Sequence, residues 1–208
     1  MRTVLHTLIV VSLLLLGCAS KIPPLSQPKP PNLAKDVAKA VVMVLQVDDQ
    51  TGEVHTCTGF SVGPKLILTA AHCVGMFQVP VSVDGDIAGV MRVDRALDLA
   101  LLTIPQFKPS LSIRPNPPTW GESVNGMGFG LGLGLLVITQ HRVELTQWLL
   151  NPGESPGIVY LNPFYPGMSG GPVYDGAGLV VGMVQKSSRE YGFGVGSDVL
   201  NFFLTHGK

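Results

Sequence analysis

The sequence predicts an all-β protein built as a sandwich or as paired barrels, and three observations support this fold class. The 208 residues include 25 Gly and 17 Pro, which interrupt the chain too often for long helices. Hydrophobic residues make up 46% of the chain and charged residues 13%, so we expect a packed core. Short β-branched segments recur between turn signals from about residue 40 onward.

The expected strands fall into two groups, separated by a proline-rich stretch at 105–118. The first group comprises 40–47, 58–62, 66–69, 79–83, 87–93 and 99–104. The second comprises 123–129, 135–145, 158–161, 173–174, 179–185 and 193–196. A short helix is expected at 199–204, with Ser197 or Asp198 as its cap. Alternating glycines from Gly126 to Gly134 are interpreted as a flexible connection, because their spacing differs from that of a nucleotide-binding loop.

Residues 1–17 are typical of an export signal rather than of a folded domain. Their apolar run, 7–16, is too short to span a bilayer comfortably as a helix. The following Leu-Leu-Gly-Cys, which ends at Cys18, resembles the lipobox of bacterial lipoproteins. This resemblance implies cleavage before Cys18, lipidation of its thiol and attachment to a membrane. An ordinary secretory signal cut near Ala19 or Ser20 is the alternative.

Residues 18–36 are expected to form a stalk, because proline at this density favours extended conformations over helix or sheet. A proline-motif ligand is the alternative interpretation of this segment. The expected location is the cell envelope. By resemblance to Gram-negative lipoproteins, Ala19 after the lipidated cysteine implies sorting to the outer membrane.

The three cysteines of the chain leave one unpaired in an exported protein. If Cys18 carries lipid, Cys57 and Cys73 remain as a pair in an oxidising compartment. A metal site formed by Cys57, Cys73 and His55 is the competing interpretation. Its spacing lacks the closely paired ligands typical of zinc, so we expect no metal.

Three short segments contain the residue types of a nucleophilic hydrolase. They are Leu-Thr-Ala-Ala-His-Cys ending at Cys73, Leu-Asp-Leu-Ala-Leu-Leu at 97–102, and Gly-Met-Ser-Gly-Gly-Pro-Val at 167–173. In this order, His72, Asp98 and Ser169 closely resemble the catalytic triad of chymotrypsin-like serine proteases. The resemblance covers roughly 40–204, and 194–200 is similar to the protease domain of bacterial heat-shock-type serine proteases.

This resemblance implies two six-stranded antiparallel β-barrels of the chymotrypsin type, with a short C-terminal helix. The protease domain is expected at 37–208, with the first barrel at about 37–112 and the second at about 118–200. A disulfide between Cys57 and Cys73, beside the catalytic histidine, is also implied. We expect no regulatory peptide-binding domain to follow.

The implied chemistry explains why these residue types are needed. A serine hydroxyl is a poor nucleophile at neutral pH and must lose its proton as it attacks. An imidazole titrates near neutrality, so His72 can accept that proton, while Asp98 orients the ring and stabilises its charged form. By resemblance, the backbone N–H groups of Gly167 and Ser169 form the oxyanion hole that stabilises the intermediate.

Two positions depart from the digestive members of the family. Met168 precedes the nucleophile where those enzymes carry Asp, so we expect no activation by insertion of a newly freed N-terminus. The same residue leaves open whether the oxyanion hole is formed before substrate binds. Pro163 stands six residues before the serine, where trypsin carries the Asp that attracts Lys or Arg, so cleavage after basic residues is not expected.

Substrate-binding residues are expected on two segments near the nucleophile. The segment 182–187 resembles the strand that pairs with the substrate backbone and walls the specificity pocket. The expected substrate-binding residues are Pro163, Phe164, Tyr165, Gln185, Lys186, Ser187 and Phe193. Lys186 would favour an acidic side chain and the aromatic residues an apolar one. We expect a preference for apolar or small residues.

The expected function is a serine endopeptidase anchored to the cell envelope, acting on protein or peptide substrates without a cofactor. A protease-fold lipoprotein with little or no activity, acting as a surface binding module, is the alternative. The 14 basic and 14 acidic residues balance, so no nucleic-acid partner is expected. The oligomeric state is not predicted.

Overall fold

The structure is a computed structural model that describes residues 32–75, 80–132, 134–148 and 157–206. These residues belong to one compact unit, 31–208. The expected signal peptide 1–17, Cys18 and the stalk up to residue 31 lie outside the described residues. In the described ranges, no helix has the length and apolar character needed to cross a membrane.

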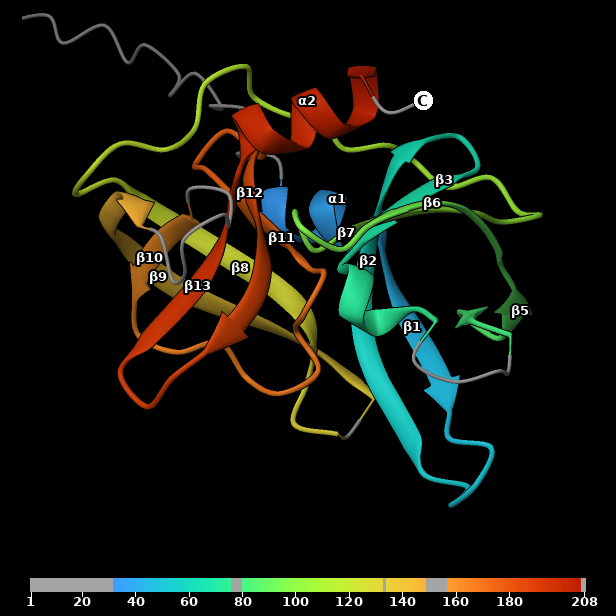
Figure 1. The fold of residues 1–208 in the computed structure, drawn as a ribbon. Helices are drawn as coiled ribbons and strands as arrows, with labels where there is room; N and C mark the ends of the chain where they lie inside the picture. Colours follow the sequence, from blue (N-terminus) through green and yellow to red (C-terminus); the bar gives the residue numbers. More distant parts are fainter. Residues whose placement is uncertain (1–31, 76–79, 133, 149–156, 207–208) are drawn as a thin grey trace, which may run out of the picture. The chain divides into compact units, whose positions relative to one another are not determined.

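The first group of strands forms a seven-stranded sheet in the order β5-β4-β1-β2-β3-β7-β6. Its strands are β1 (Val41–Val47), β2 (Val54–Gly63), β3 (Leu66–Thr69), β4 (Ser82–Val83), β5 (Asp86–Ile87), β6 (Gly89–Asp94) and β7 (Leu99–Thr103). In Figure 1 these strands run from blue to green and form a curled half-barrel. Only Ala88 separates β5 from β6 in the chain, although the two strands stand at opposite ends of the sheet order.

The break at Ala88 explains why seven strands replace the six expected in this half. The Ala88 N–H donates to the Val81 carbonyl at 2.9 Å, so the expected single strand 87–93 is divided into two. Each part pairs with a different neighbour, β5 with β4 and β6 with β7.

The second group forms a closed barrel in the order β10-β13-β12-β11-β8-β9, shown in yellow to red in Figure 1. Its strands are β8 (Ser123–Gly130), β9 (Leu135–Trp148), β10 (Gly157–Leu161), β11 (Pro172–Tyr174), β12 (Val180–Ser187) and β13 (Tyr191–Gly196). Helix α2 (Ser197–His206) follows β13, and its Leu200 and Phe203 are buried. The all-β class, the closed second barrel and the C-terminal helix are therefore confirmed.

The β-branched and leucine-rich segments form strands because their side chains fill the cores. Phe60, Leu68 and Leu102 of the first sheet are fully buried, as are Val173 and Val181 of the barrel. Burying one such side chain stabilises the fold by about 1.5–3 kcal/mol.

Helix α1 (Leu33–Ala38) was not predicted, because its first residues were assigned to the stalk. The Asn32 side chain caps it by accepting from the Lys35 N–H. Val37 is 2% exposed, and a Cβ added to Gly178 would lie 2.5 Å from Leu33 Cδ1. The packed domain therefore includes residues from 33 to 36 that were expected to be extended.

The interpretation of the alternating glycines as a flexible connection is wrong for Gly126, Gly128 and Gly130, whereas the overlapping expectation of a strand at 123–129 is confirmed. These residues lie in β8 and pair with Thr139, Val137 and Leu135 of β9. A Cβ at Gly126 would lie 2.6 Å from Phe164 Cε1, so the absence of a side chain leaves room for packing. Gly132 and Gly134 have positive φ and lie in the turn that follows.

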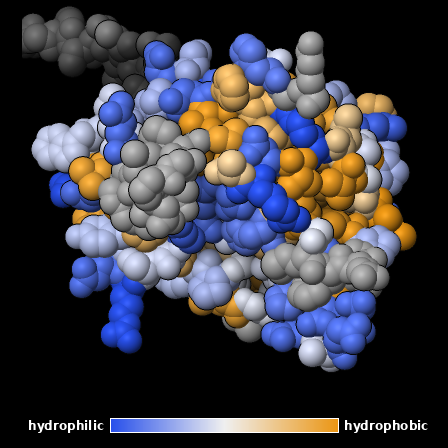
Figure 2. Space-filling view, viewed as in Figure 1, coloured by the Kyte–Doolittle hydropathy of each residue, from blue (hydrophilic) through white to orange (hydrophobic). Residues whose placement is uncertain are grey.

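Exposed apolar side chains gather on β5 and β6. Ile87 is 72% exposed and Met91 59%, and Val90 and Val93 are also exposed. Figure 2 shows hydrophobic surface on this side of the molecule, whereas the middle of the face is hydrophilic.

Candidate active site

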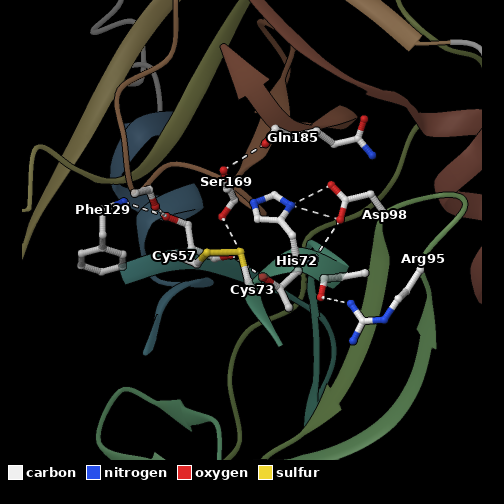
Figure 3. The surroundings of a disulfide bond; sticks show 12 residues. Cys57, His72, Cys73, Arg95, Asp98, Phe129, Ser169 and Gln185 are labelled. Atoms are coloured by element: carbon white, nitrogen blue, oxygen red, sulfur yellow. Dashed lines mark hydrogen bonds and ion pairs between the residues drawn. A yellow bond between two sulfur atoms is a disulfide. The ribbon is translucent and has the colours of Figure 1, made fainter. Parts of the chain in front are cut away.

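His72 lies in a short 3-10 turn, η1 (Ala71–Cys73), that follows the end of β3. A disulfide joins Cys73 of this turn to Cys57 of β2, as the sequence predicts (Figure 3). The ligand-type atoms of Cys57, His72 and Cys73 all lie within 4.8 Å of one another. Because the two sulfur atoms are bonded to each other, they offer no thiolate to a metal, and His55 is not part of this group.

Asp98 stands immediately before β7, and its carboxylate is directed at His72. Oδ2 lies 2.9 Å and Oδ1 3.1 Å from His72 Nδ1, and Oδ1 also accepts from the His72 backbone N–H at 2.9 Å. The carbonyl of Asp98 accepts from the Ala71 N–H at 3.1 Å. The aspartate therefore holds both the ring and the backbone of the histidine, with Nδ1–H as donor and Nε2 left as an acceptor.

The backbone of Asp98 has φ 53°, in the left-handed region. Residues other than glycine adopt this conformation rarely, although Asp and Asn tolerate it best. Such outliers gather at functional sites, where surrounding contacts compensate the strain. The hydrogen bonds that Asp98 accepts from His72 and Ala71 compensate the strain here.

Ser169 lies in the turn before β11, and the ring of His72 lies between it and Asp98 in Figure 3. Its hydroxyl donates to the Gln185 carbonyl at 3.0 Å. In the part of the chain that the structure describes, this hydroxyl makes no hydrogen bond to His72. Gln185 thereby connects Ser169 to the segment that carries Asp98. Its side-chain Nε2 donates at 2.8 Å to the carbonyl of Leu97, the residue before Asp98.

The peptides around Ser169 are oriented by their carbonyl groups. The Pro166 carbonyl accepts from the Leu131 N–H at 3.0 Å, and the Met168 carbonyl accepts from the Gly171 N–H at 2.9 Å. In a trans peptide the N–H points opposite to the C=O. The N–H groups of Gly167 and Ser169 therefore point away from these partners, and neither has an acceptor among the described residues.

Met168 is fully buried, and it packs in the apolar cluster of the second barrel. Its N–H donates to the Tyr165 carbonyl at 3.0 Å, and its sulfur accepts from the Tyr165 N–H at 3.4 Å. The position that carries an ion-paired Asp in the digestive enzymes is thus an apolar anchor for the turn.

A pocket of about 180 Å³ opens beside Ser169. It is lined by Phe164, Tyr165, Pro166, Ser169, Val184, Lys186 and Ser187. Four of the expected substrate-binding residues are in this set, whereas Pro163, Gln185 and Phe193 are not. Pro166 and Val184 were not predicted, although both lie next to or within segments that had been singled out.

Phe164 is 3% exposed, and its ring is packed inside the second barrel. The centre of its ring lies 4.1 Å from that of His141 and 5.5 Å from that of Tyr160. The Phe164 N–H donates to the Ser187 hydroxyl at 2.9 Å, which links the two sides of the pocket. Phe164 therefore limits the depth of the pocket.

His141 is a buried titratable group of this barrel, and burial lowers its pKa. Its Nδ1 lies 3.1 Å from the Leu161 carbonyl, and its Nε2 lies 2.6 Å from the Thr139 hydroxyl. A neutral ring with the proton on Nδ1 satisfies both contacts. His141 therefore has a structural role, as expected for a satisfied interior histidine.

The sequence matches the family described as the trypsin-like peptidase domain over residues 57–183. It is 28% identical over 167 residues to Protease Do-like 2, chloroplastic, of Arabidopsis thaliana. That alignment covers 72% of this chain but only 28% of the relative, so the chain spans little more than a quarter of that protein's length.

Two solved structures have a similar fold. The active form of the Rv3671c protease from M. tuberculosis superposes with a TM-score of 0.76 at 24% identity, covering 99% of this chain and 95% of that one. The inactive form superposes with a TM-score of 0.71 at 23% identity, covering 88% and 98%. These matches support the chymotrypsin-like fold. The family match spans more than half of this chain. The chain therefore belongs to the trypsin-like peptidase family.

Proposed function

We propose that this protein is a serine endopeptidase that hydrolyses peptide bonds through an acyl-enzyme on Ser169. The observation that carries the proposal is the hydrogen-bonded pair His72–Asp98, with Nδ1 2.9 Å from Oδ2, beside the hydroxyl of Ser169. Asp98 stabilises the tautomer in which His72 Nε2 is free to accept a proton. Membership of the trypsin-like peptidase family supports the same chemistry.

The reaction begins when Ser169 exchanges the Gln185 carbonyl for His72 Nε2 as its hydrogen-bond acceptor. Oγ then attacks the substrate carbonyl carbon while Nε2 takes the hydroxyl proton. When the C–N bond breaks, Nε2 returns that proton to the leaving amine. A water molecule then attacks the ester while Nε2 takes its proton. The same nitrogen gives that proton to Ser169 Oγ as the acyl C–O bond breaks and the acid is released.

The backbone N–H groups of Gly167 and Ser169 form the proposed oxyanion hole. Their lack of an acceptor among the described residues supports this role, because unpaired N–H groups beside a nucleophile are available to a developing oxyanion. The buried Met168 supports a turn that is ordered without a freed N-terminus. We therefore propose that the enzyme needs no proteolytic activation.

The pocket beside Ser169 supports a preference for small or apolar residues before the scissile bond. Its volume is about 180 Å³, and the buried Phe164 and Val184 contribute to its lining. The exposed Lys186 is the only charged residue among those that line it. Profiling with a peptide library would overturn this preference if cleavage clustered after Lys, Arg or Glu.

The cell-envelope location remains part of the proposal. It rests on the lipobox-like sequence ending at Cys18 and on the proline-rich segment that follows. Metabolic labelling with a fatty-acid analogue tests it, with Cys18→Ala as the control. The wild-type protein should incorporate the label and the variant should not.

Labelling with a fluorophosphonate probe tests the enzymatic function, because the probe forms a covalent bond only with an activated serine. Wild-type protein should be labelled, and Ser169→Ala should not. Ser188→Ala is a matched control, since among the described residues this hydroxyl bonds only within its own turn, to the Tyr191 carbonyl and to the N–H groups of Glu190 and Tyr191. Failure to label folded wild-type protein would favour a binding module without activity.

A further inference from the structure

Thr58 is a fully buried residue of β2 that contacts the Ser169 turn from the other half of the molecule. Its backbone N–H donates to the Ser169 carbonyl at 2.8 Å. Its hydroxyl donates to the Gly167 carbonyl, also at 2.8 Å. One residue of the half-barrel therefore binds the carbonyl groups of both residues whose N–H groups form the proposed oxyanion hole.

The direction of the hydroxyl hydrogen bond is fixed by a third contact. The Phe129 N–H, from β8, lies 2.8 Å from Thr58 Oγ1 and can only donate. Figure 3 shows Phe129 near Cys57, the residue before Thr58. A hydroxyl has one proton to give. Since Oγ1 accepts from Phe129, that proton is available to the Gly167 carbonyl.

These contacts fix the peptide that joins Gly167 to Met168. Its carbonyl accepts from Thr58, and its N–H donates to the Tyr165 carbonyl at 3.0 Å. Gly167 itself has φ +96°, and a Cβ there would lie 2.2 Å from the Phe129 carbonyl oxygen. The peptide is thus held at both edges, next to the N–H that faces the proposed oxyanion.

The space around Thr58 is filled by backbone. A Cβ on Gly128 would lie 2.7 Å from Thr58 Oγ1, and one on Gly170 would lie 2.2 Å from the Thr58 carbonyl oxygen. A Cβ on Gly171 would lie 3.2 Å from the Thr58 methyl carbon. A site this crowded has no room for a water molecule in place of the hydroxyl.

We propose that the hydroxyl of Thr58 is a positioning group that holds the oxyanion turn in its productive orientation. The proposal rests on the proposed serine endopeptidase function. Thr58 does not touch the substrate, and it acts through the Gly167–Met168 peptide. Because oxyanion stabilisation is greatest in the transition state, loss of the hydroxyl should lower kcat rather than raise KM.

Two variants separate the hydroxyl from the shape of the side chain. Thr58→Val keeps the branched shape without the hydroxyl, and Thr58→Ser keeps the hydroxyl without the methyl group. We expect kcat to fall by about tenfold or more in Thr58→Val, short of the two to three orders of magnitude that loss of an oxyanion donor brings. Thr58→Ser should stay within about threefold of wild type, with KM nearly unchanged in both.

Ser61→Ala is the matched control. Ser61 is also fully buried on β2, and its hydroxyl also donates to a backbone carbonyl at 2.8 Å, that of Gly63. This variant should lose stability like Thr58→Val but keep the wild-type kcat. Inhibition by a peptide aldehyde, whose adduct occupies the oxyanion hole, should weaken in Thr58→Val alone.

The outcomes distinguish the two proposals. Wild-type turnover with an unchanged kcat in Thr58→Val would overturn the role of Thr58 and leave the endopeptidase function standing. If Thr58→Val fails to fold, a tenfold loss of kcat in folded Thr58→Ser would overturn that role as well. Folded wild-type protein without turnover or fluorophosphonate labelling would overturn both.

Discussion

The two parts of the site are assembled in different ways. His72 and Asp98 follow and precede neighbouring strands of one sheet, β3 and β7, in which Thr69 pairs with Ala100. Their side chains are already hydrogen-bonded to each other. Ser169 comes from the closed barrel, its hydroxyl bonds to Gln185, and its carbonyl bonds to Thr58 of the half-barrel.

This difference indicates that the His72–Asp98 pair is a local feature of one sheet, whereas the Ser169 turn depends on contacts between both halves. The disulfide packs against the Ser169 turn, because Cys73 Sγ lies 3.8 Å from the Ser169 carbonyl oxygen. This is a packing contact, since a disulfide sulfur carries no proton. Substitutions in the His72–Asp98 pair should therefore lower kcat without changing the free energy of unfolding. Substitutions in the Ser169 turn should change both.

The largest expected effect comes from Asp98→Asn, which tests the local pair. The amide donates where the carboxylate accepted, so His72 is held in the wrong tautomer, and kcat should fall by about 10⁴-fold. Steady-state kinetics on a peptide substrate measure this. Asp36→Asn, which removes the exposed ion pair with Lys39, is the control and should behave as wild type. A loss below about tenfold in Asp98→Asn would contradict the assigned role.

Gly167→Ala tests the turn and should lower kcat by about 10²–10³-fold, the loss expected for one oxyanion donor. The new Cβ would lie 2.2 Å from the Phe129 carbonyl oxygen, so the turn must move. Gly52→Ala is the matched control, because Gly52 also has a positive φ but no atom within 4 Å of an added Cβ. The control should lose some stability and keep its kcat. Equal kinetics in the two variants would show that the turn tolerates the displacement.

Substitution of Met168 distinguishes an apolar anchor from an ion-pairing position. Met168→Leu should cost less than about 1.5 kcal/mol of unfolding free energy, because the volume is nearly conserved. Met168→Asp should cost about 3–5 kcal/mol, because the charge would be buried without a partner. Denaturant unfolding near pH 7 measures both. A Met168→Asp protein as stable as wild type would show that the turn can rearrange to hydrate the carboxylate.

The smallest expected effect concerns the interior of the barrel. Because burial lowers the pKa of His141, the unfolded chain binds a proton more readily than the folded one. Unfolding free energy should therefore fall as the pH decreases below about 6.5, by no more than about 1.4 kcal/mol per pH unit for one site. His141→Gln should show a shallower decline between pH 7 and pH 5. The same slope in both proteins would assign the acid sensitivity to other groups.

Much of the architecture follows from local sequence patterns. The expected strand 66–69 coincides with β3, and most other strands begin and end within a few residues of the expectation. Turn-forming glycine and proline between β-branched runs determine these boundaries locally. The prediction failed at residues 33–36, where burial of a helix against the domain outweighs the extended tendency of the preceding prolines.

The sequence by itself determined which residues meet at the site, because His72, Asp98 and Ser169 each stand in a recognisable motif at a strand end. Only the tertiary structure revealed the contacts that orient them. The Thr58 hydroxyl and the Gly167 carbonyl are 109 residues apart in the chain, and the Gln185 side chain and the Leu97 carbonyl are 88 apart. Hydrogen bonds of this kind leave no periodic pattern in the sequence, because they join residues of the two halves that lie far apart in the chain.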